Sequence, residues 1–179
     1  YISEIFSSFQ GEGSYIGERQ IFLRFAGCNL SCDYCDTKEE LNQVLKNPVS
    51  KEDLLEKINS FPNLKNLYHS LAITGGEPLL QVEFLKEFLK DIKIKIYLET
   101  NGTLSKNLEE IIEKVDIVAL DFKIPSATKL PSYLVEHKKS LEIAYGKEVF
   151  VKIVVTQDTK GAEIDEAADV IASIDSEIL

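Results

Sequence analysis

Three cysteines lie within eight positions of this chain, and the rest of the sequence contains none. Cys28, Cys32 and Cys35 stand in the stretch CNLSCDYCDT with the spacing Cys-x3-Cys-x2-Cys. Thiolates are ligands for zinc and for iron–sulfur clusters. Three thiolates would leave one iron of a four-iron cluster without a protein ligand, and an open position can bind a substrate or cofactor. The spacing favours a cluster, since zinc sites usually combine two hooks of two ligands each.

Two other interpretations of the cysteines stay open. One is a structural zinc site in a binding module without catalysis, with His69 or His137 as the fourth ligand. The other is three unrelated buried thiols, which their confinement to one loop disfavours. His137 lies in VEHKKS, a charged helical pattern, and we expect it to be solvated. An odd number of clustered cysteines argues against a secreted disulfide framework and indicates a reducing cytoplasm.

The elements that position the cysteines follow from the hydrophobic pattern. Short apolar runs rich in β-branched and aromatic residues predict buried strands over residues 2–9, 21–25, 71–74, 94–98, 117–120 and 149–156. Helical patterns alternate with them over residues 51–61, 82–92, 108–115, 131–144 and 162–174. Ser50 is placed as an N-cap with Asp53 three positions later. This alternation predicts an α/β fold with a mostly parallel sheet.

Polar and glycine-rich residues follow the predicted strands. The cysteines come after the second run, TGGEP after the third, ETNG after the fourth and DFKIP after the fifth. In parallel α/β sheets and barrels, ligands bind at the carboxyl ends of the strands. We therefore expect these four segments to converge on one site at that rim.

The composition limits the classes of partner. Acidic residues outnumber basic ones, 30 to 20, and the formal net charge is −10. This balance argues against non-specific binding to nucleic acid or to an anionic membrane. No apolar run approaches the roughly 20 residues that span a bilayer, and the first ten residues lack the features of a signal peptide. The sequence has no methionine, so we expect terminal residues to be missing from it.

The cysteine spacing, with the aromatic Tyr34 just before the third thiol, resembles the radical S-adenosylmethionine (SAM) enzymes. TGGEP resembles their SAM-binding glycine-rich stretch. The resemblance implies a partial (β/α) barrel, one radical SAM core domain over residues 1–179, and a [4Fe–4S] cluster whose open iron binds SAM. A zinc module lacks these features, and metal analysis separates the two.

A narrower resemblance covers FSSFQGEGSYIGERQIFLRFAGCNLSCDYCDT, which is similar to the start of the 7-carboxy-7-deazaguanine synthases. That family implies ring contraction of 6-carboxy-5,6,7,8-tetrahydropterin to 7-carboxy-7-deazaguanine with loss of ammonia, in the pathway to queuosine and other 7-deazaguanines. It also implies Mg²⁺, a flavodoxin or ferredoxin as electron donor, and a homodimer. A glycyl-radical activase is the alternative within the superfamily, but FQGEG and Thr37 favour the synthase.

The family resemblance also implies site residues, position by position. Thr37 matches the magnesium ligand, although it could be a turn residue. The substrate positions are Phe9, Gln10, Gly11, Arg24 and Thr74, and the SAM positions are Gly76, Glu99, Asp121, Phe122 and Lys123. The stretch QGEGSYIG could instead be a plain hairpin, and Arg24 could pair with Glu12 or Glu18. DFK stands where relatives often have SPK, which is a departure at the last three SAM positions.

Overall fold

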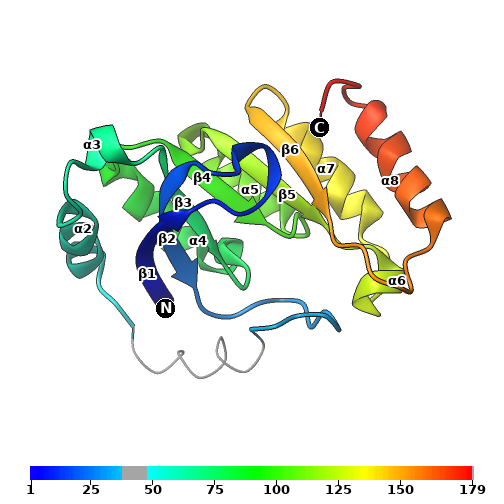
Figure 1. Ribbon diagram of the computed structural model, residues 1–179, viewed down its shortest axis with the longest axis horizontal. Helices are drawn as coiled ribbons and strands as arrows, with labels where there is room; N and C mark the ends of the chain where they lie inside the picture. Colours follow the sequence, from blue (N-terminus) through cyan, green and yellow to red (C-terminus); the bar gives the residue numbers. More distant parts are fainter. Residues whose placement is uncertain (38–47, 179) are drawn as a thin grey trace.

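A computed structural model describes residues 1–37 and 48–178 of the chain (Figure 1). Its centre is one six-stranded sheet in the order β1-β2-β3-β4-β5-β6. β1 is antiparallel to β2, and every later neighbour is parallel. The strands are β1 (Ile2–Phe9), β2 (Arg19–Phe25), β3 (Ser70–Gly75), β4 (Ile96–Thr100), β5 (Ile117–Phe122) and β6 (Glu148–Ile153). The predicted α/β fold with a mostly parallel sheet is therefore confirmed.

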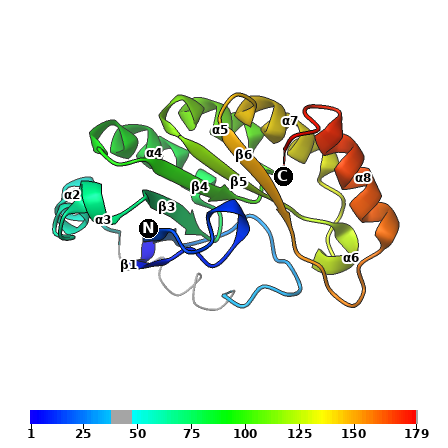
Figure 2. The ribbon, with the colours of Figure 1, turned by 45° about the horizontal axis from the view of Figure 1, so that its top comes forward.

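Helices connect the parallel strands, as crossovers between parallel neighbours require. Figure 2 shows that α4, α5 and α7 cover one face of the sheet. The α-helices are α2 (Lys51–Asn59), α3 (Leu64–Leu67), α4 (Val82–Phe88), α5 (Ser105–Ile111), α6 (Pro125–Thr128), α7 (Leu134–Ala144) and α8 (Gly161–Ala172). Short 3₁₀ turns are η1 (Gly13–Tyr15), η3 (Pro78–Gln81), η4 (Leu89–Asp91) and η5 (Ile112–Lys114). Within the described ranges, no helix is long and apolar enough to cross a membrane.

The helix-covered face holds the main hydrophobic core. Leu23, Ile73, Leu98 and Val118 point into it from four neighbouring strands, and none of them is exposed. Complete burial of such a side chain stabilises the fold by about 1.5–3 kcal/mol. This layer fixes the strands, and hence the position of everything that follows their carboxyl ends.

The other face of the sheet is apolar in the middle of the strands and polar at their carboxyl ends. Ala72, Tyr97, Ala119 and Phe150 belong to a smaller apolar cluster on this face. Side chains two positions apart share a face of a strand. The residues two positions further along these strands are Thr74, Glu99, Asp121 and Lys152. The period-two pattern therefore carries polar groups to the carboxyl end of the uncovered face.

The loop between β1 and β2 crosses the uncovered face and reaches β6. Gly13, with φ +66°, lies so close to Phe150 that a Cβ atom would stand 2.2 Å from its ring. Tyr15 hydrogen-bonds Glu148 through its hydroxyl group. The loop thus bridges the two edge strands of a sheet that does not close, which makes the fold a partial barrel.

The bounds of the predicted elements agree with the structure in most places. The N-cap at Ser50 is confirmed, because its Oγ accepts a hydrogen bond of 3.1 Å from the Asp53 amide. The helix predicted over residues 82–92 ends as an α-helix at Phe88 and continues as the 3₁₀ turn η4. The helix predicted to begin at Pro131 begins at Leu134.

Candidate active site

A cavity of about 360 Å³ opens at the carboxyl end of the parallel strands. All three cysteines, the TGG turn and polar residues from the ends of β4, β5 and β6 line it. The lining side chains and turns include Cys28, Cys32, Cys35, Thr37, Thr74, Gly76, Glu99, Asn101, Asp121, Lys123 and Lys152. The expected convergence of four separate segments on one rim is therefore confirmed.

The thiol loop, residues 27–37, runs from the end of β2 along one side of the cavity. It contains turns and bends but no helix or strand. Cys28 is exposed, Cys32 buried and Cys35 half-buried. Although the Cys28 residue is exposed overall, desolvation of its thiol group raises the thiol pKa, as it does for Cys32. Without a metal these thiols would stay protonated at neutral pH, whereas metal binding requires and favours thiolates.

The arrangement of the thiols separates two kinds of metal site. Among the described residues, no three His, Cys, Asp or Glu side chains lie close enough together to hold one ion. A tetrahedral zinc site needs such a group. An iron–sulfur cluster instead accepts its thiolates on different irons and tolerates wider separation. The donor set of three loop thiols beside an open cavity therefore fits a cluster with one open iron.

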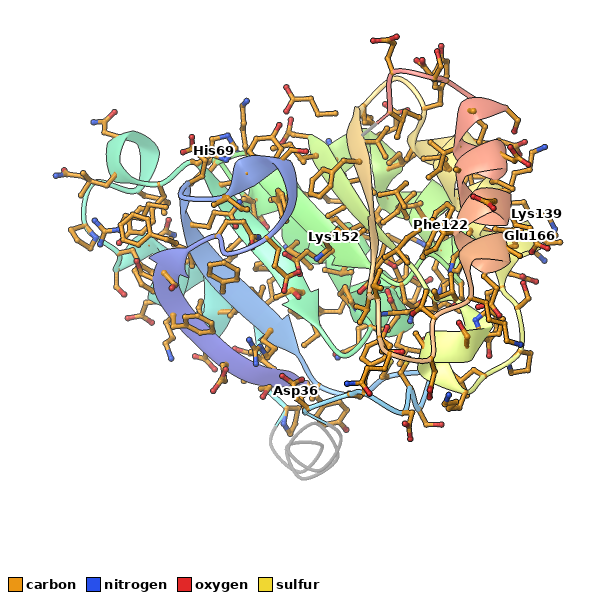
Figure 3. The ribbon with its side chains drawn as sticks, turned by 45° about the vertical axis from the view of Figure 1, so that its right-hand side comes forward. Asp36, His69, Phe122, Lys139, Lys152 and Glu166 are labelled. Atoms are coloured by element: carbon orange, nitrogen blue, oxygen red, sulfur yellow. The ribbon has the colours of Figure 1, made fainter. Side chains whose placement is uncertain are left out.

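The two histidines do not complete a zinc site either. His69 precedes β3, and its Nδ1 lies 3.1 Å from Ser70 Oγ. Figure 3 shows His69 at the end of the sheet opposite to Asp36 of the thiol loop. His137, expected to be solvated, is 2% exposed, so that expectation is wrong. The charged helical pattern around it did not reveal that one side of α7, with His137, Ser140, Leu141 and Ala144, is buried.

The TGGEP turn packs directly against the start of the thiol loop. The Gly76 amide donates to Phe25 O (3.1 Å), and the Glu77 amide donates to Gly27 O (2.9 Å). A Cβ atom on Gly75 would lie 2.1 Å from Phe25 O, and one on Gly76 would lie 2.1 Å from Gly27 O. Only glycine permits this approach of two backbones. The two glycines therefore fix the thiol loop relative to β3.

Glu77 is a site residue that the sequence analysis missed. Its carboxyl group is 0% exposed and accepts hydrogen bonds from the Leu79 amide (3.0 Å), Thr100 Oγ1 (2.8 Å) and the Asn101 amide (2.8 Å). Burial raises its pKa to about 7, against the opposite effect of the three donors. Glu77 joins the turns after β3 and β4. A charged residue between the glycine pair and Pro78 was the signal available in the sequence.

The DFK segment places its three side chains differently. Lys123 Nζ lies 2.6 Å from Asp121 Oδ2 and 3.1 Å from the Tyr34 hydroxyl of the thiol loop. Burial disfavours the charge of Lys123, but the Asp121 carboxylate outweighs it and raises the lysine pKa. Asp121 Oδ1 is buried and has no hydrogen-bond partner in the described part of the chain. Phe122 points to the helix-covered face and stacks on His137 at 4.5 Å between ring centroids.

Glu99 is the centre of a hydrogen-bond network at the end of β4. Its carboxylate accepts from Thr74 Oγ1 (3.0 Å) and from Gln10 Nε2 (2.9 Å). Gln10 is 5% exposed, and its Oε1 accepts from the amides of Gly11 and Glu12. The structure thus joins Gln10, Thr74 and Glu99, three of the residues expected at the site.

Lys152 and Glu12 belong to the same end of the cavity and were also missed. Lys152 Nζ lies 2.8 Å from Glu12 Oε2 and 3.8 Å from Glu99 Oε2. The lysine side chain is 16% exposed. Burial disfavours its charge, but the Glu99 and Glu12 carboxylates raise its pKa, so it remains charged at neutral pH. A lysine that alternates with apolar residues in VFVKIVV was the only signal in the sequence.

Of the remaining expected residues, Phe9, Gly11 and Arg24 lie outside the cavity lining, whereas Thr37 belongs to it. Arg24 NH1 pairs with Glu4 at 3.6 Å, and not with Glu12 or Glu18. Its Nε atom has no hydrogen-bond partner among the described residues. Phe9 is 65% exposed, and Gly11 is exposed beside it. Thr37 is in the lining, with its Oγ1 3.7 Å from Cys35 Sγ.

Comparison with known proteins places the chain in a family. The model of the radical SAM superfamily matches residues 23–154. The 7-carboxy-7-deazaguanine synthase of Geobacter sulfurreducens is 38% identical over 99% of this chain and 78% of its own length. That of Methanothermobacter thermautotrophicus is 46% identical over 69% of this chain, but the match spans about half of that enzyme, 49%.

A solved structure agrees in fold. The crystal structure of QueE from Escherichia coli superposes with a TM-score of 0.63 and 24% identity, over 98% of this chain and 79% of that one. Both the cysteine motif and the TGGEP turn fall within the matched superfamily region. The chain belongs to the 7-carboxy-7-deazaguanine synthase family of the radical SAM superfamily.

Proposed function

We propose that this protein contracts the ring of 6-carboxy-5,6,7,8-tetrahydropterin to 7-carboxy-7-deazaguanine, with release of ammonia, in 7-deazaguanine and queuosine biosynthesis. One observation carries the proposal. The three thiols of Cys-x3-Cys-x2-Cys share a single cavity with the TGGEP turn and the ends of β4 and β5. Family membership then selects the reaction from those of the superfamily.

In this proposal Cys28, Cys32 and Cys35 hold a [4Fe–4S] cluster and leave one iron for SAM. When bound, the cluster and SAM together supply the hydrogen-abstracting radical chemistry of the superfamily. The protein's part is to bind and orient the reactants and to keep them apart from solvent. A cluster held there would be sensitive to oxygen, because the three cysteines line a cavity that is accessible from outside.

The SAM subsite is formed by Gly76, Glu99, Asp121, Phe122 and Lys123. Gly76 leaves its backbone open to close approach, since it has no side chain. Glu99 can accept hydrogen bonds from hydroxyl or amino groups, and the unpartnered Asp121 Oδ1 supplies a further acceptor. Lys123 balances the acidic charge nearby. Phe122 acts from the opposite face of β5, where its ring packs under the segment.

The substrate subsite is formed by Phe9, Gln10, Gly11, Arg24 and Thr74. Arg24 is the proposed partner of the substrate carboxylate, because a guanidinium group matches a carboxylate in two parallel hydrogen bonds. Its unpartnered Nε and its loose contact of 3.6 Å with Glu4 leave donors for such a ligand. Gln10 acts mainly through the backbone turn that its amide holds.

Thr37 is the proposed ligand of Mg²⁺, a hard cation that prefers oxygen atoms. Its hydroxyl lines the cavity next to the carboxylate of Asp36. Mg²⁺ held by Thr37 would supply a positive charge that helps to bind the substrate carboxylate. Removal of the cation would then weaken substrate binding and leave SAM binding unchanged.

The remaining parts of the proposal concern the context of the enzyme. A flavodoxin or ferredoxin delivers the reducing electron, the functional unit is a homodimer, and the protein works in the cytoplasm as a single radical SAM core domain. These points rest on the resemblance of the sequence to the family.

The test is anaerobic turnover by the reconstituted and reduced protein with SAM, Mg²⁺ and 6-carboxytetrahydropterin. Mass spectrometry should detect 7-carboxy-7-deazaguanine, with the Cys35→Ala variant as the inactive control. Release of 5′-deoxyadenosine without that product would keep the radical chemistry and overturn the substrate, so that a protein substrate, as for a glycyl-radical activase, would be tried next. Absence of both products would overturn the proposal.

A further inference from the structure

Helix α7 contacts the turn after β4, at the rim of the cavity, through two side chains that lie one helical turn apart. Ser140 Oγ donates to Gly102 O at 2.7 Å, and His137 Nε2 lies 3.1 Å from Asn101 O. Both residues are buried, at 0% and 2% exposure. Helix α7 thus supports the turn after β4 from behind, while Asn101 faces the cavity on the other side.

His137 also contacts the turn after β5. The Lys123 amide donates to His137 Nε2 at 3.3 Å. Asn101 and Lys123 both line the cavity, but they follow different strands. The Nε2 atom of His137 therefore lies between the backbones of two turns at the site.

The His137 ring is held firmly in this place. It stacks on Phe122 with ring centroids 4.5 Å apart and planes 10° from parallel, and Tyr133 contacts it edge-on. On the third side a Cβ atom at Gly102 would lie 3.2 Å from the ring Cδ2. The imidazole therefore cannot turn away from the two turns without displacing its neighbours.

Chemistry limits what this nitrogen can do. Burial lowers the pKa of His137 to about 4, so the ring is neutral at physiological pH. In a neutral imidazole each nitrogen either donates or accepts. With its proton on Nε2, His137 donates to Asn101 O. With its proton on Nδ1, it accepts from the Lys123 amide. In either form, Nε2 makes one of the two hydrogen bonds and lies against the other backbone group, so the ring packs between the two turns.

We propose that His137 is a positioning residue for SAM, which sets the spacing of the Asn101 and Lys123 turns without touching the cofactor. The inference rests on one part of the proposed function, namely that SAM binds beside these two turns. It gives a role to a buried histidine that does not line the cavity and so need not contact a ligand. It also explains why the buried side of the helix carries an imidazole.

Three variants separate positioning from packing. His137→Phe keeps the stacking on Phe122 and loses the Nε2 hydrogen bond, whichever of the two turns it is made to. His137→Gln keeps a distal amide that can accept from Lys123 and donate to Asn101. Ser140→Ala is the matched control, because it removes one buried hydrogen bond from α7 to the same turn without touching Lys123.

The experiment measures SAM binding to each cluster-loaded holoenzyme by equilibrium dialysis, without pterin or reductant. We expect binding about tenfold weaker in His137→Phe and within about threefold of wild type in His137→Gln and Ser140→Ala. In turnover, the KM for SAM should rise in His137→Phe while kcat at saturating SAM changes little. Iron content and circular dichroism verify that each variant carries its cluster and is folded.

Unchanged SAM affinity in His137→Phe would overturn the proposal, and so would an equal loss in Ser140→Ala. If His137→Phe does not fold, His137→Asn replaces it, because its shorter amide cannot bridge both turns, and the same loss is expected. Failure of both variants to fold would assign His137 to stability alone. Since SAM binding is measured without the pterin, a wrong substrate in the proposed function would leave this result intact.

Discussion

The two walls of the cavity are built on different principles. One wall is the thiol loop, residues 27–37. The other is the strand rim, by which we mean the turns at residues 75–78, 101–103 and 123–125. In the strand rim, Glu77 and His137 join turns from three strands through buried hydrogen bonds. The thiol loop has no regular structure, and its cysteine sulfurs meet few donors.

This difference indicates how the site is assembled. Buried polar groups that satisfy one another make the strand rim rigid before any ligand binds. The thiol loop is held at its start by the TGG turn and in its middle by the Asp33 amide, which donates to Thr128 O at 2.9 Å. A metal cluster bound by the three thiols would order the loop further, as metal binding does in other thiolate sites.

The largest expected effect concerns the thiol loop and is chemical. Cys28→Ala should reduce SAM cleavage by at least about 10³-fold, because one iron loses its ligand. The free energy of unfolding of the metal-free protein should change by less than about 0.5 kcal/mol, since Cys28 is exposed. Reverse-phase analysis of 5′-deoxyadenosine and urea unfolding measure the two quantities. Cleavage retained in this variant would refute the ligand assignment.

The contact between Gly76 of the strand rim and Gly27 of the thiol loop should respond in the opposite way, because its loss should affect stability more than chemistry. Gly76→Ala places a Cβ atom 2.1 Å from Gly27 O, and backbone cannot yield as a side chain does. We expect a loss of about 3–5 kcal/mol in the free energy of unfolding of the metal-free protein. Urea unfolding tests this.

Gly161→Ala provides the matched control for that substitution. A Cβ atom at Gly161 meets no atom within 4 Å, and the residue begins α8. The change should be neutral or should stabilise the protein by about 0.5 kcal/mol. An equal change in the free energy of unfolding for the two variants would show that the contact between Gly76 and Gly27 imposes no steric constraint.

The strand rim should also make the stability of the protein sensitive to acid, because it holds a buried neutral histidine. The pKa of His137 falls from about 6.5 in the unfolded chain to about 4 in the fold. Its contribution to stability is therefore complete above pH 6.5 and is lost as the pH falls toward 4. Wild type should lose about 3 kcal/mol more than His137→Gln over this interval.

Urea unfolding of both proteins at pH 7, 6, 5 and 4 measures this difference. Other groups, including Glu77, titrate in both proteins and cancel in the comparison. Parallel curves for the two proteins would mean that His137 opens to solvent, and the rim would then be no more rigid than the thiol loop.

The smallest effect is expected for Lys152, which lines the cavity at the end of β6. Lys152→Met removes the charge beside Glu12 and Glu99, and we expect the KM for the carboxypterin to rise about tenfold. SAM cleavage without pterin should stay near the wild-type rate. Lys139→Met is the control, because Lys139 lies on α7, far from Lys152 in Figure 3. A reduced rate of SAM cleavage would instead place Lys152 in the SAM subsite.

The sequence predicted the fold and the location of the site for a physical reason. Strand and helix periods are local properties, and the polar segments fall directly after the predicted strands. The cysteine loop, TGGEP, Glu99 and Lys123 were therefore found, and the cavity contains them. Glu77, Lys152 and the burial of His137 were not found, because each depends on the partners that distant elements bring to it.

The sequence by itself determined the order of strands and helices and the carboxyl rim as the place where the polar segments meet, and it predicted the three thiols as metal ligands. Spacing within one loop and the register of side chains along one strand are properties of neighbouring residues. Only the tertiary structure decided which charges are paired and which polar groups are buried. Lys152 meets Glu12 from 140 positions away, and His137 meets Asn101 from 36. Such contacts follow from how β6 and α7 pack on the sheet, which no local pattern encodes.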